Sequence, residues 1–552
     1  MSELVERIRR ETIGDDAVIE GPFGPRRMVY ADATASGRSV RFVEELVREQ
    51  VLTTYANTHT EASFTGRRTT ALREEARRVI HRAVGGGPDD AVVFCGAGAT
   101  GAIDKLIRLL ALHRGPRPVV FVGPFEHHSN ELPWRESGAD VVVIGEDGDG
   151  AIDLEHLEHE LRRHADRVLR IGSFSAASNV TGIVADVDRV AIMLHRHDAL
   201  SLWDYAAAGP YLPIEMNGAP YLPDGHLAYK DAIFLSPHKL AGGPGSPGVL
   251  VAKRKLLRAS VPTVPGGGTI VFVSPGEQSY HPDPEVREEG GTPAIVESIR
   301  AGLAFALKEA VGADEIRRRE HAMARRALRS WSANPRIEIL GNTECERLAV
   351  ISFGLRHPPM QLHAAFVVAV LSDLFGIQAR SGCFCAGPYV HRAFPIDEPW
   401  SRRMHAEARR GQLGAKLALT RVSFPYYTSE AAFTYVVDAV HLVADEGWKL
   451  LPQYRFDPAG GMWEHRCRGV GAPVGLAAML DAPPPRFERA PESVLAGQLA
   501  AARRILAAAA AGAPPDAFGD PPCTPELERI RWFPLPVEAL ARLHGAGGQA
   551  AA

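Results

Sequence analysis

The chain contains 552 residues, of which 45% are hydrophobic and 23% are charged, values close to the average of globular proteins. A chain of this length and composition can bury a large core, so wholesale disorder is excluded. The 62 Lys and Arg residues nearly balance the 66 Asp and Glu residues. This balance argues against a general nucleic-acid binder and against a protein that binds anionic membranes, because both normally carry a basic excess.

Six cysteines are too few for a disulfide scaffold. The N-terminus alternates charges and has no apolar segment of the signal-peptide type. No uninterrupted apolar run approaches the roughly 18 residues that a membrane span needs. We therefore expect a soluble, cytoplasmic protein with reduced thiols, in which a functional cysteine is more often catalytic than cross-linked.

Short apolar runs alternate with helical patterns between residues 90 and 255. The runs are rich in Val and Ile and end in turn-forming or polar residues, which is typical of buried strands. The intervening segments repeat apolar residues every three or four positions, which predicts amphipathic helices. This alternation predicts an α/β fold with a mostly parallel sheet, whose ligands bind beyond the carboxyl ends of strands. The predicted strands are 91–95, 119–123, 141–145, 168–174, 199–204, 232–236 and 248–252.

The rest of the chain has a different pattern. Residues 295–330 predict one long helix, and a smaller α/β unit follows with strands at 348–355 and 417–424 and a helix at 362–376. The segment 532–540 is apolar enough to form a docking strand or a patch against the main body. We divide the chain into an N-terminal segment (1–27), a large domain (28–304), a smaller C-terminal domain (305–450) and a partly low-complexity extension (451–552).

A glycine-rich turn, FCGAGATGAIDKL (94–106), lies between a predicted strand and a predicted helix. Glycines let the backbone approach an anion, and a helix N-terminus offers free N–H groups, so a phosphate is the natural ligand. Gly96, Gly98 and Gly101 also match the dinucleotide-binding pattern, but the acid expected at the end of the next strand is absent. A tight turn without a ligand remains an alternative.

A second motif, LSPHKLAGGPGSPGVLV (235–251), places Lys239 three residues beyond a predicted strand. A lysine at the ligand-binding end of a sheet can form a Schiff base with a carbonyl cofactor. Ser236 and His238 flank it and can donate hydrogen bonds to a phosphate. An isolated lysine is usually a solvated surface amine, but the S-x-H-K-x-x-G-G context favours the covalent role.

Two further polar residues follow predicted strands. Asp204 ends an apolar run, where a carboxylate is costly unless it pairs with a cation such as a protonated pyridine nitrogen. His127, in PFEHHSN, follows the 119–123 strand and can stack on a flat ring. Taken alone, the first is better explained as a helix N-cap and the second as a structural histidine.

The ordered set of glycine-rich loop, histidine, aspartate and S-x-H-K resembles the class V (fold type I) pyridoxal-phosphate aminotransferase family. Within that family it resembles the cysteine desulfurases and the sulfurase domain of molybdenum-cofactor sulfurases. The resemblance covers about residues 28–445. It implies a fold type I transferase, with a large domain containing a mostly parallel sheet, a smaller α/β domain, and a homodimeric assembly.

The resemblance also implies roles for individual residues. Lys239 would bind pyridoxal 5′-phosphate and move the α-proton of the substrate, Asp204 would pair with the pyridine nitrogen, and His127 would stack on the ring. Asn179 would lie near the ring hydroxyl and the substrate carboxylate, and Thr292 would complete the phosphate site of a partner subunit. The residues implied to cradle the phosphate are Gly98, Ala99, Thr100, Ser236 and His238.

The segment QARSGCFCAGPY (378–389) matches the R-x-G-x-x-C pattern in which desulfurases carry a nucleophilic cysteine on a mobile loop. The nucleophile is then Cys385, with Arg380 five residues before it and Cys383 as an additional thiol. Arg421, in LALTRVSFPYY, matches the arginine that binds the substrate carboxylate through its bidentate fork. His59 matches a histidine near the substrate.

The resemblance implies conversion of L-cysteine to L-alanine, with the sulfur held as a persulfide on Cys385 and passed to an acceptor protein or a small thiol. It implies no metal, no nucleic acid and no membrane partner. One departure is Ala207, where the family usually has a glutamine. Two alternatives remain open: a class V lyase, epimerase or aminotransferase in which Cys385 is not essential, and a non-catalytic scaffold.

Overall fold

The computed structural model describes residues 3–394, 396–467, 475–481, 487–509 and 520–549. These residues fold into two compact units, and the division falls within helix α10 (Ala313–Ser332). Each unit is assembled from segments that are separate in the sequence, so the units are not consecutive stretches of the chain. The first unit comprises Met1–Ile13, Ala33–Ala322 and Glu344–Ala349, and the second comprises Gly14–Asp32, Met323–Thr343 and Val350–Ala552.

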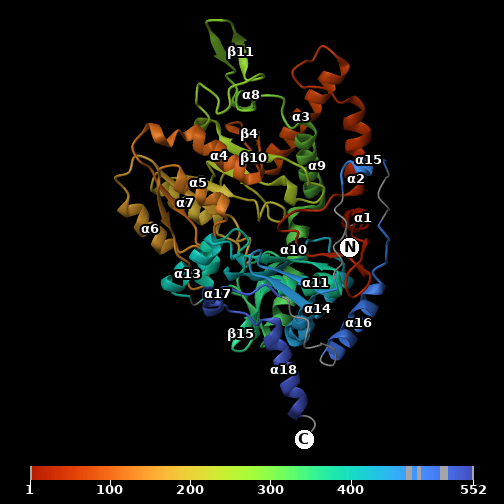
Figure 1. Cartoon of the computed structure of the whole chain (residues 1–552). Helices are drawn as coiled ribbons and strands as arrows, with labels where there is room; N and C mark the ends of the chain where they lie inside the picture. Colours follow the sequence, from red (N-terminus) through yellow and green to blue (C-terminus); the bar gives the residue numbers. More distant parts are fainter. Residues whose placement is uncertain (1–2, 395, 468–474, 482–486, 510–519, 550–552) are drawn as a thin grey trace. The chain divides into compact units, whose positions relative to one another are not determined.

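A seven-stranded sheet forms the centre of the first unit (Figure 1). Its strands, in chain order, are β4 (Asp90–Cys95), β5 (Val119–Val122), β6 (Asp140–Val143), β7 (Arg170–Ser175), β8 (Leu200–Asp204), β9 (Ala232–Leu235) and β10 (Gly248–Lys253). Their spatial order is β4-β10-β9-β8-β7-β5-β6, and only β10 runs antiparallel to its neighbours. The predicted α/β class with a mostly parallel sheet is confirmed.

Helices cover both faces of this sheet. On one face, Ile103 and Leu106 of α4 (Gly98–Leu110) pack in a fully buried cluster with Val120 of β5. On the other face, α7 (Val187–Arg196) lies so close to β7 that a Cβ on Gly172 would come within 2.5 Å of a Leu194 methyl group. Because successive strand residues face opposite sides, both faces are apolar, which explains the uninterrupted Val and Ile runs.

The outer edge of β4 is closed by side chains instead of another strand. The backbone N–H groups of Val92 and Phe94 donate to carboxylate oxygens of Glu285 (2.7 Å) and Glu289 (2.6 Å). Arg77, from α3 (Phe64–Ala83), donates to the carbonyl oxygen of Val92 and also pairs with Glu289. These contacts satisfy backbone groups that an exposed edge would leave open to association.

The predicted single helix over 295–330 is wrong at one position. The structure contains α9 (Ile295–Val311) and α10, separated by Gly312 with φ of +87°. Glycine has no Cβ, so it adopts this conformation at little cost and ends the helix. The apolar periodicity continues on both sides of Gly312, which is why the sequence predicted a single helix.

The second unit is built on a smaller antiparallel sheet. Its strands are β13 (Ile337–Ile339), β14 (Val350–His357), β15 (Met360–Leu362), β17 (Arg380–Gly382) and β18 (Leu419–Ser423). The order is β13-β14-β18-β17, with β15 paired to β14. Helices α11 (Ala364–Phe375) and α14 (Glu430–Glu446) pack with this unit. The predicted strands at 348–355 and 417–424 and the helix at 362–376 are confirmed.

The C-terminal part of the second unit packs around an aromatic cluster. Phe533 is fully buried and contacts His363, Phe456 and Trp463 edge-on, with ring centroids 4.5, 5.0 and 6.2 Å away. The segment 532–540 therefore serves as an apolar patch and not as a strand. Parts of the predicted extension, at 468–474, 482–486, 510–519 and 550–552, lie outside the described residues.

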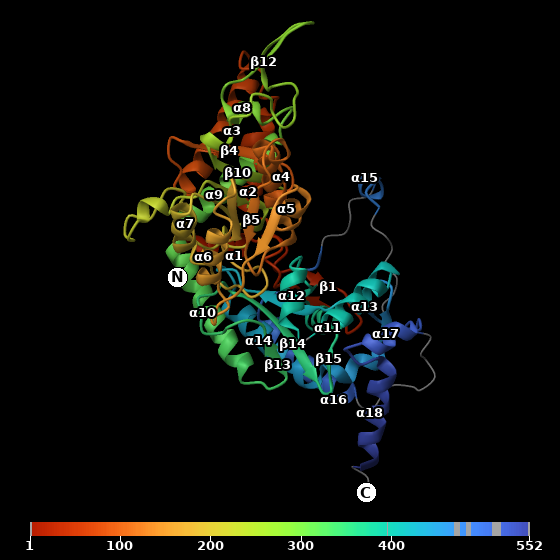
Figure 2. The same cartoon turned by 90° about the vertical axis from the view of Figure 1, so that its left-hand side faces the viewer.

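Two further helices of this region, α13 (Glu398–Arg409) and α17 (Pro525–Ile530), lie side by side (Figure 2). The hydroxyl of Thr524, which caps α17, donates to the Glu407 carboxylate of α13 at 2.5 Å. Helix α13, which lies between Cys385 and Arg421 in the sequence, thus packs against α17 of the C-terminal extension. In the described part of the chain, no helix is long and apolar enough to cross a membrane.

Candidate functional site

Three predicted residues lie at or just beyond the carboxyl ends of β8 and β9. Asp204 is the last residue of β8, Ser236 follows β9, and Lys239 ends the short helix η6 (Pro237–Lys239). The Lys239 N–H donates to the Ser236 carbonyl oxygen at 3.0 Å, which fixes the turn. Neighbouring parallel strands end on one side of a sheet, so topology brings these residues together.

The turn around Lys239 is held by close backbone packing. The Gly37 N–H donates to the His238 carbonyl oxygen at 3.0 Å. A Cβ on Gly37 would lie 2.1 Å from the Leu240 carbonyl oxygen, and one on Gly243 would lie 2.0 Å from that of Pro237. Only glycine fits at both positions, so the Lys239 backbone is fixed from two sides. The sequence indicated the second of these glycines but gave no signal for Gly37.

The glycine-rich loop meets the Ser236 turn at the N-terminus of α4. The Ala99 N–H donates to the Ser236 hydroxyl at 2.9 Å. Gly98 has φ of +53°, and a Cβ there would lie 2.9 Å from the Ser236 hydroxyl and 3.3 Å from the His238 ring. The structure therefore brings Gly98, Ala99, Ser236 and His238 together at a helix start, where an anion is favoured.

Thr100 and His127 are joined through a residue that sequence reasoning missed. The Ser129 hydroxyl lies 2.6 Å from the Thr100 hydroxyl and 3.0 Å from Nδ1 of His127. The Ser129 N–H also donates to the same ring nitrogen at 3.1 Å. These bonds orient the imidazole relative to the glycine-rich loop. Ser129 lies two residues after His127, which is the usual spacing for a side chain that accepts a hydrogen bond from the backbone of a turn. This spacing was the one signal in the sequence for Ser129.

Two buried carboxylates shape the charge of this region. Asp204 is 4% exposed, and burial raises its pKa against the opposing effects of the Ala206 N–H and the Lys239 charge. Burial also raises the pKa of Glu126 to about 7, although hydrogen bonds from Ser175 and Asn130 oppose this effect, and the Asp204 charge adds to the increase. A cation bound beside Asp204 would offset the cost of burying its charge.

The remaining predicted residues of the first unit fall into two places. Asn179 is 8% exposed and lies in the turn that follows β7. His59 and Thr292 are exposed, and Asn57 bridges them: its amide donates to the Thr292 hydroxyl at 3.3 Å, and its oxygen lies 3.0 Å from Nδ1 of His59. Asn57 has no motif of its own, so sequence reasoning did not find it.

In the second unit, Arg380 and Arg421 face each other on the neighbouring antiparallel strands β17 and β18. Arg421 is only 2% exposed, and its guanidinium donates to Asp32 at 2.8 Å. The same guanidinium lies over the Phe384 ring, 4.8 Å from its centroid. An arginine fork fixed by a carboxylate and an aromatic ring is well oriented to bind a second carboxylate.

Cys385 lies in a tight turn between β17 and α12 (Gly387–Ala393), closed by a 2.9 Å hydrogen bond from the Ala386 N–H to the Cys383 carbonyl oxygen. Phe384 and Cys385 have φ of +53° and +56°. Two consecutive non-glycine residues in the left-handed region are strained, and such strain concentrates at functional sites. Both cysteines of the turn are half-buried, while the Phe384 ring is buried and anchors it.

Comparison with known proteins identifies the family. Residues 29–434 match the aminotransferase class-V family. The chain belongs to this family. It is 29% identical over 368 residues to a probable cysteine desulfurase of Halalkalibacterium halodurans, covering 66% of this chain and 85% of that protein. It is 28% identical over 397 residues to a cysteine desulfurase of Dickeya dadantii, covering 70% of this chain and 89% of that protein.

Solved structures show the same fold. The apo cysteine desulfurase of Thermococcus onnurineus superimposes with a TM-score of 0.63 at 23% identity, covering 76% of this chain and 95% of that one. The S-sulfonic acid form of the cysteine desulfurase CsdA of Escherichia coli also gives a TM-score of 0.63, at 22% identity, with coverage of 80% and 98%. The predicted fold type I architecture is confirmed.

Proposed function

We propose that this protein is a pyridoxal-phosphate-dependent cysteine desulfurase that converts L-cysteine to L-alanine and receives the sulfur on Cys385. One observation carries the proposal: Lys239 lies directly beyond β9, next to the glycine-lined loop and to a buried Asp204. Membership of the class V family and the desulfurase names of its relatives support the same assignment.

The side chains of the first unit fit pyridoxal 5′-phosphate. The space that a Cβ on Gly98 would fill, next to Ser236 and His238, suits a phosphate at the N-terminus of α4. Asp204 has a raised pKa because it is buried, so a protonated pyridine nitrogen would stabilise its charge. Lys239 would hold the cofactor, His127 would face its ring, and Thr100 and Asn179 would complete the set.

When bound, the cofactor supplies an electron sink for the carbon next to the substrate amino group. The chain provides the rest. Lys239 moves the α-proton, and Arg421, with Arg380 opposite it and His59 from the exposed group, binds the substrate. The Cys385 thiolate attacks the substrate sulfur: an S–S bond forms, the C–S bond breaks, and the electron pair stays with the carbon, which takes up a proton. The products are alanine and a Cys385 persulfide.

The wider setting follows from the same proposal. A homodimer, in which the exposed Thr292 completes the partner subunit's phosphate site, fits the position of this residue next to Asn57. The persulfide sulfur passes to an acceptor protein or a small thiol, in the cytoplasm and without nucleic acid or membrane. Ala207 is buried and offers no side-chain donor, so the ring hydroxyl of a bound cofactor would lack the hydrogen bond that a glutamine would give, a change of about 1 kcal/mol.

The test is an assay of the purified protein with pyridoxal phosphate, L-cysteine and a reductant, in which alanine and sulfide are measured together. Equal amounts of both are expected, and none in the Lys239→Ala variant. Formation of pyruvate and ammonia instead would assign the protein to the lyases of the same family. Alanine formation that persists undiminished in a Cys385→Ser variant would remove the persulfide step.

A further inference from the structure

The first unit contains a hollow at the end of its sheet opposite to Lys239. A cavity of about 880 Å³ is lined by residues next to the start of β4 and by Lys253, the last residue of β10. Because β10 runs antiparallel, its end lies beside the start of β4, with Lys253 paired to Asp90 in register. This volume lies in the range of small-molecule sites.

The lining of this cavity is strongly basic. Lys253, Arg254, Lys255 and Arg258 come from one short stretch that continues β10, and His226 faces the same space. Of the lining residues that the structure describes, Asp89 is the one carboxylate. Arg254 pairs with Asp283 at 2.9 Å, but this carboxylate does not line the hollow. With Asp89 as the one lining carboxylate, the four cations favour an anionic ligand.

Buried carboxylates behind the wall hold two of these cations in place. Asp90 and Asp231 have no exposed side-chain area and pair with Lys253 at 2.9 Å and Lys255 at 2.7 Å. Both ammonium groups also lie over the Tyr229 ring, 5.6 and 5.3 Å from its centroid. Lys253 also donates to the Asn217 side chain, and Lys255 to the Tyr229 hydroxyl. An ammonium has three N–H donors, so each lysine is oriented by these contacts and keeps one donor for a ligand.

One cation of the cavity has a charge that the protein does not balance. Arg258 is exposed and forms no ion pair with any residue that the structure describes. The backbone of Gly85, Gly87 and Gly218 lines the same space, and without side chains it permits close approach of a ligand. The cavity therefore offers fixed donors at its base and uncompensated positive charge at its rim.

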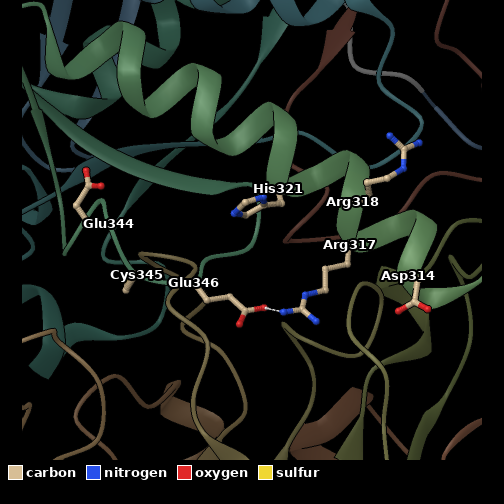
Figure 3. Close-up of a pocket in the computed structure, with 7 residues that line it drawn as sticks. All are labelled: Asp314, Arg317, Arg318, His321, Glu344, Cys345 and Glu346. Carbon is tan, nitrogen blue, oxygen red and sulfur yellow. Dashed lines mark ion pairs between the residues drawn. The ribbon is translucent and has the colours of Figure 1, made fainter.

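A second cavity of the same unit provides a contrast. It has about 450 Å³ and lies between α10 and residues 344–346. Figure 3 shows Arg317 and Glu346 reaching toward each other there, joined by an ion pair of 2.7 Å. Arg318 pairs with Glu315 at 2.8 Å. Cations and carboxylates alternate around this hollow, so it has no preference for an anion.

We propose that the basic cavity around Lys253 and Arg258 binds a phosphorylated small molecule. Phosphoryl oxygens accept charge-assisted hydrogen bonds from ammonium and guanidinium groups, and an arginine can bind them through two donors at once. The spread of cations from Lys253 to Arg258 suits a ligand with two linked phosphoryl groups. This site is separate from the phosphate cradle at Gly98, which lies at the opposite end of the sheet, and it goes beyond the proposed function.

The test is titration calorimetry with inorganic pyrophosphate at low ionic strength, on protein already saturated with pyridoxal phosphate so that the Gly98 cradle is occupied. Saturable binding is expected, weakening as salt is added. The Arg258→Glu variant should bind at least about tenfold more weakly, since it removes one charge-assisted contact and adds a repulsive charge.

The matched control is Arg318→Glu, which reverses an exposed arginine in the charge-balanced cavity and should leave the affinity unchanged. Thermal melts of both variants establish that each is folded. Absence of saturable binding to the unmodified protein would overturn the proposal. Equal affinity in the unmodified protein and the Arg258→Glu variant would overturn it as well.

Discussion

The regions around Lys239 and around Cys385 position their reactive groups in different ways. Lys239 follows a parallel strand, and its turn is locked by Gly37 and Gly243, whose missing side chains let carbonyl groups approach. Cys385 lies in a tight turn between β17 and α12, with left-handed backbone at two non-glycine positions. The first arrangement costs little strain because glycine occupies the tight positions, whereas the second stores strain in the turn that carries the thiol.

Because the two regions are built differently, we expect substitutions in them to have different effects on the protein. Under the proposed function, changes near Lys239 should affect whether the cofactor is retained. Changes near Cys385 and Arg421 should leave the cofactor bound and alter turnover or substrate affinity. The visible absorbance of the bound cofactor and the rate of alanine formation therefore report on the two regions separately.

The largest effect is expected for Cys385→Ser. Loss of the thiolate nucleophile should lower alanine formation from L-cysteine by about 10³-fold or more, equivalent to about 4 kcal/mol of barrier, with the cofactor absorbance unchanged. The measurement is steady-state kinetics beside an absorbance spectrum. Cys383→Ser is the matched control in the same turn and should retain most activity. Reversal of these two results would assign the nucleophile to the other thiol.

The second prediction concerns the aromatic cluster that the C-terminal extension completes. Phe533→Ala should lower the free energy of unfolding by about 3–4 kcal/mol, because it opens a cavity in a fully buried cluster. Denaturant unfolding measures this, with Val537→Ala, 57% exposed in the same segment, as the control. Equal stabilities of the two variants would show that the extension does not stabilise the second unit.

The third prediction concerns pH. Glu126 has a folded-state pKa of about 7, above its ordinary value of 4.5, so the folded protein binds this proton more tightly than the unfolded chain. Stability from this group is present below pH 4.5 and is lost as the pH rises to about 7, by about 3 kcal/mol. Glu126→Gln should flatten this loss in unfolding measurements across that range. The exposed Glu136→Gln serves as control, and identical pH profiles of the two variants would contradict the assignment.

The smallest effect is expected for Arg421→Lys. A lysine keeps the charge but loses the fork held by Asp32 and Phe384, so the KM for L-cysteine should rise about 10- to 100-fold, equivalent to roughly 2 kcal/mol. The cofactor absorbance should stay unchanged. The exposed Arg356→Lys is the control. A fall in kcat without any change in KM would mean that Arg421 does not bind the substrate carboxylate.

The strands of the large sheet could be predicted because each one has a recognisable local sequence pattern. Buried parallel strands read as Val and Ile runs, and the polar residue that follows each run marks the ligand-binding end. Asp204, Ser236 and Lys239 were found in this way. Gly98 was also found, since a glycine between a strand and a helix is visible without any tertiary information.

Features that depend on long-range packing gave no comparable signal. Gly37 lies far along the chain from the Lys239 turn that it contacts, and Asn57 is far from Thr292. Glu285 and Glu289 cap an edge strand that only the folded sheet defines. The helix break at Gly312 was missed because apolar periodicity on both sides outweighs a single glycine, although its positive φ ends the helix.

Reduction with borohydride followed by peptide mass mapping tests whether the Lys239 amine binds pyridoxal phosphate. The purified protein is incubated with the cofactor, reduced and digested. We predict a pyridoxyl-phosphate mass on the peptide that contains Lys239, and no such label there in the Lys239→Ala variant. A peptide with Lys239 unmodified, or a label on another lysine instead, would contradict the account.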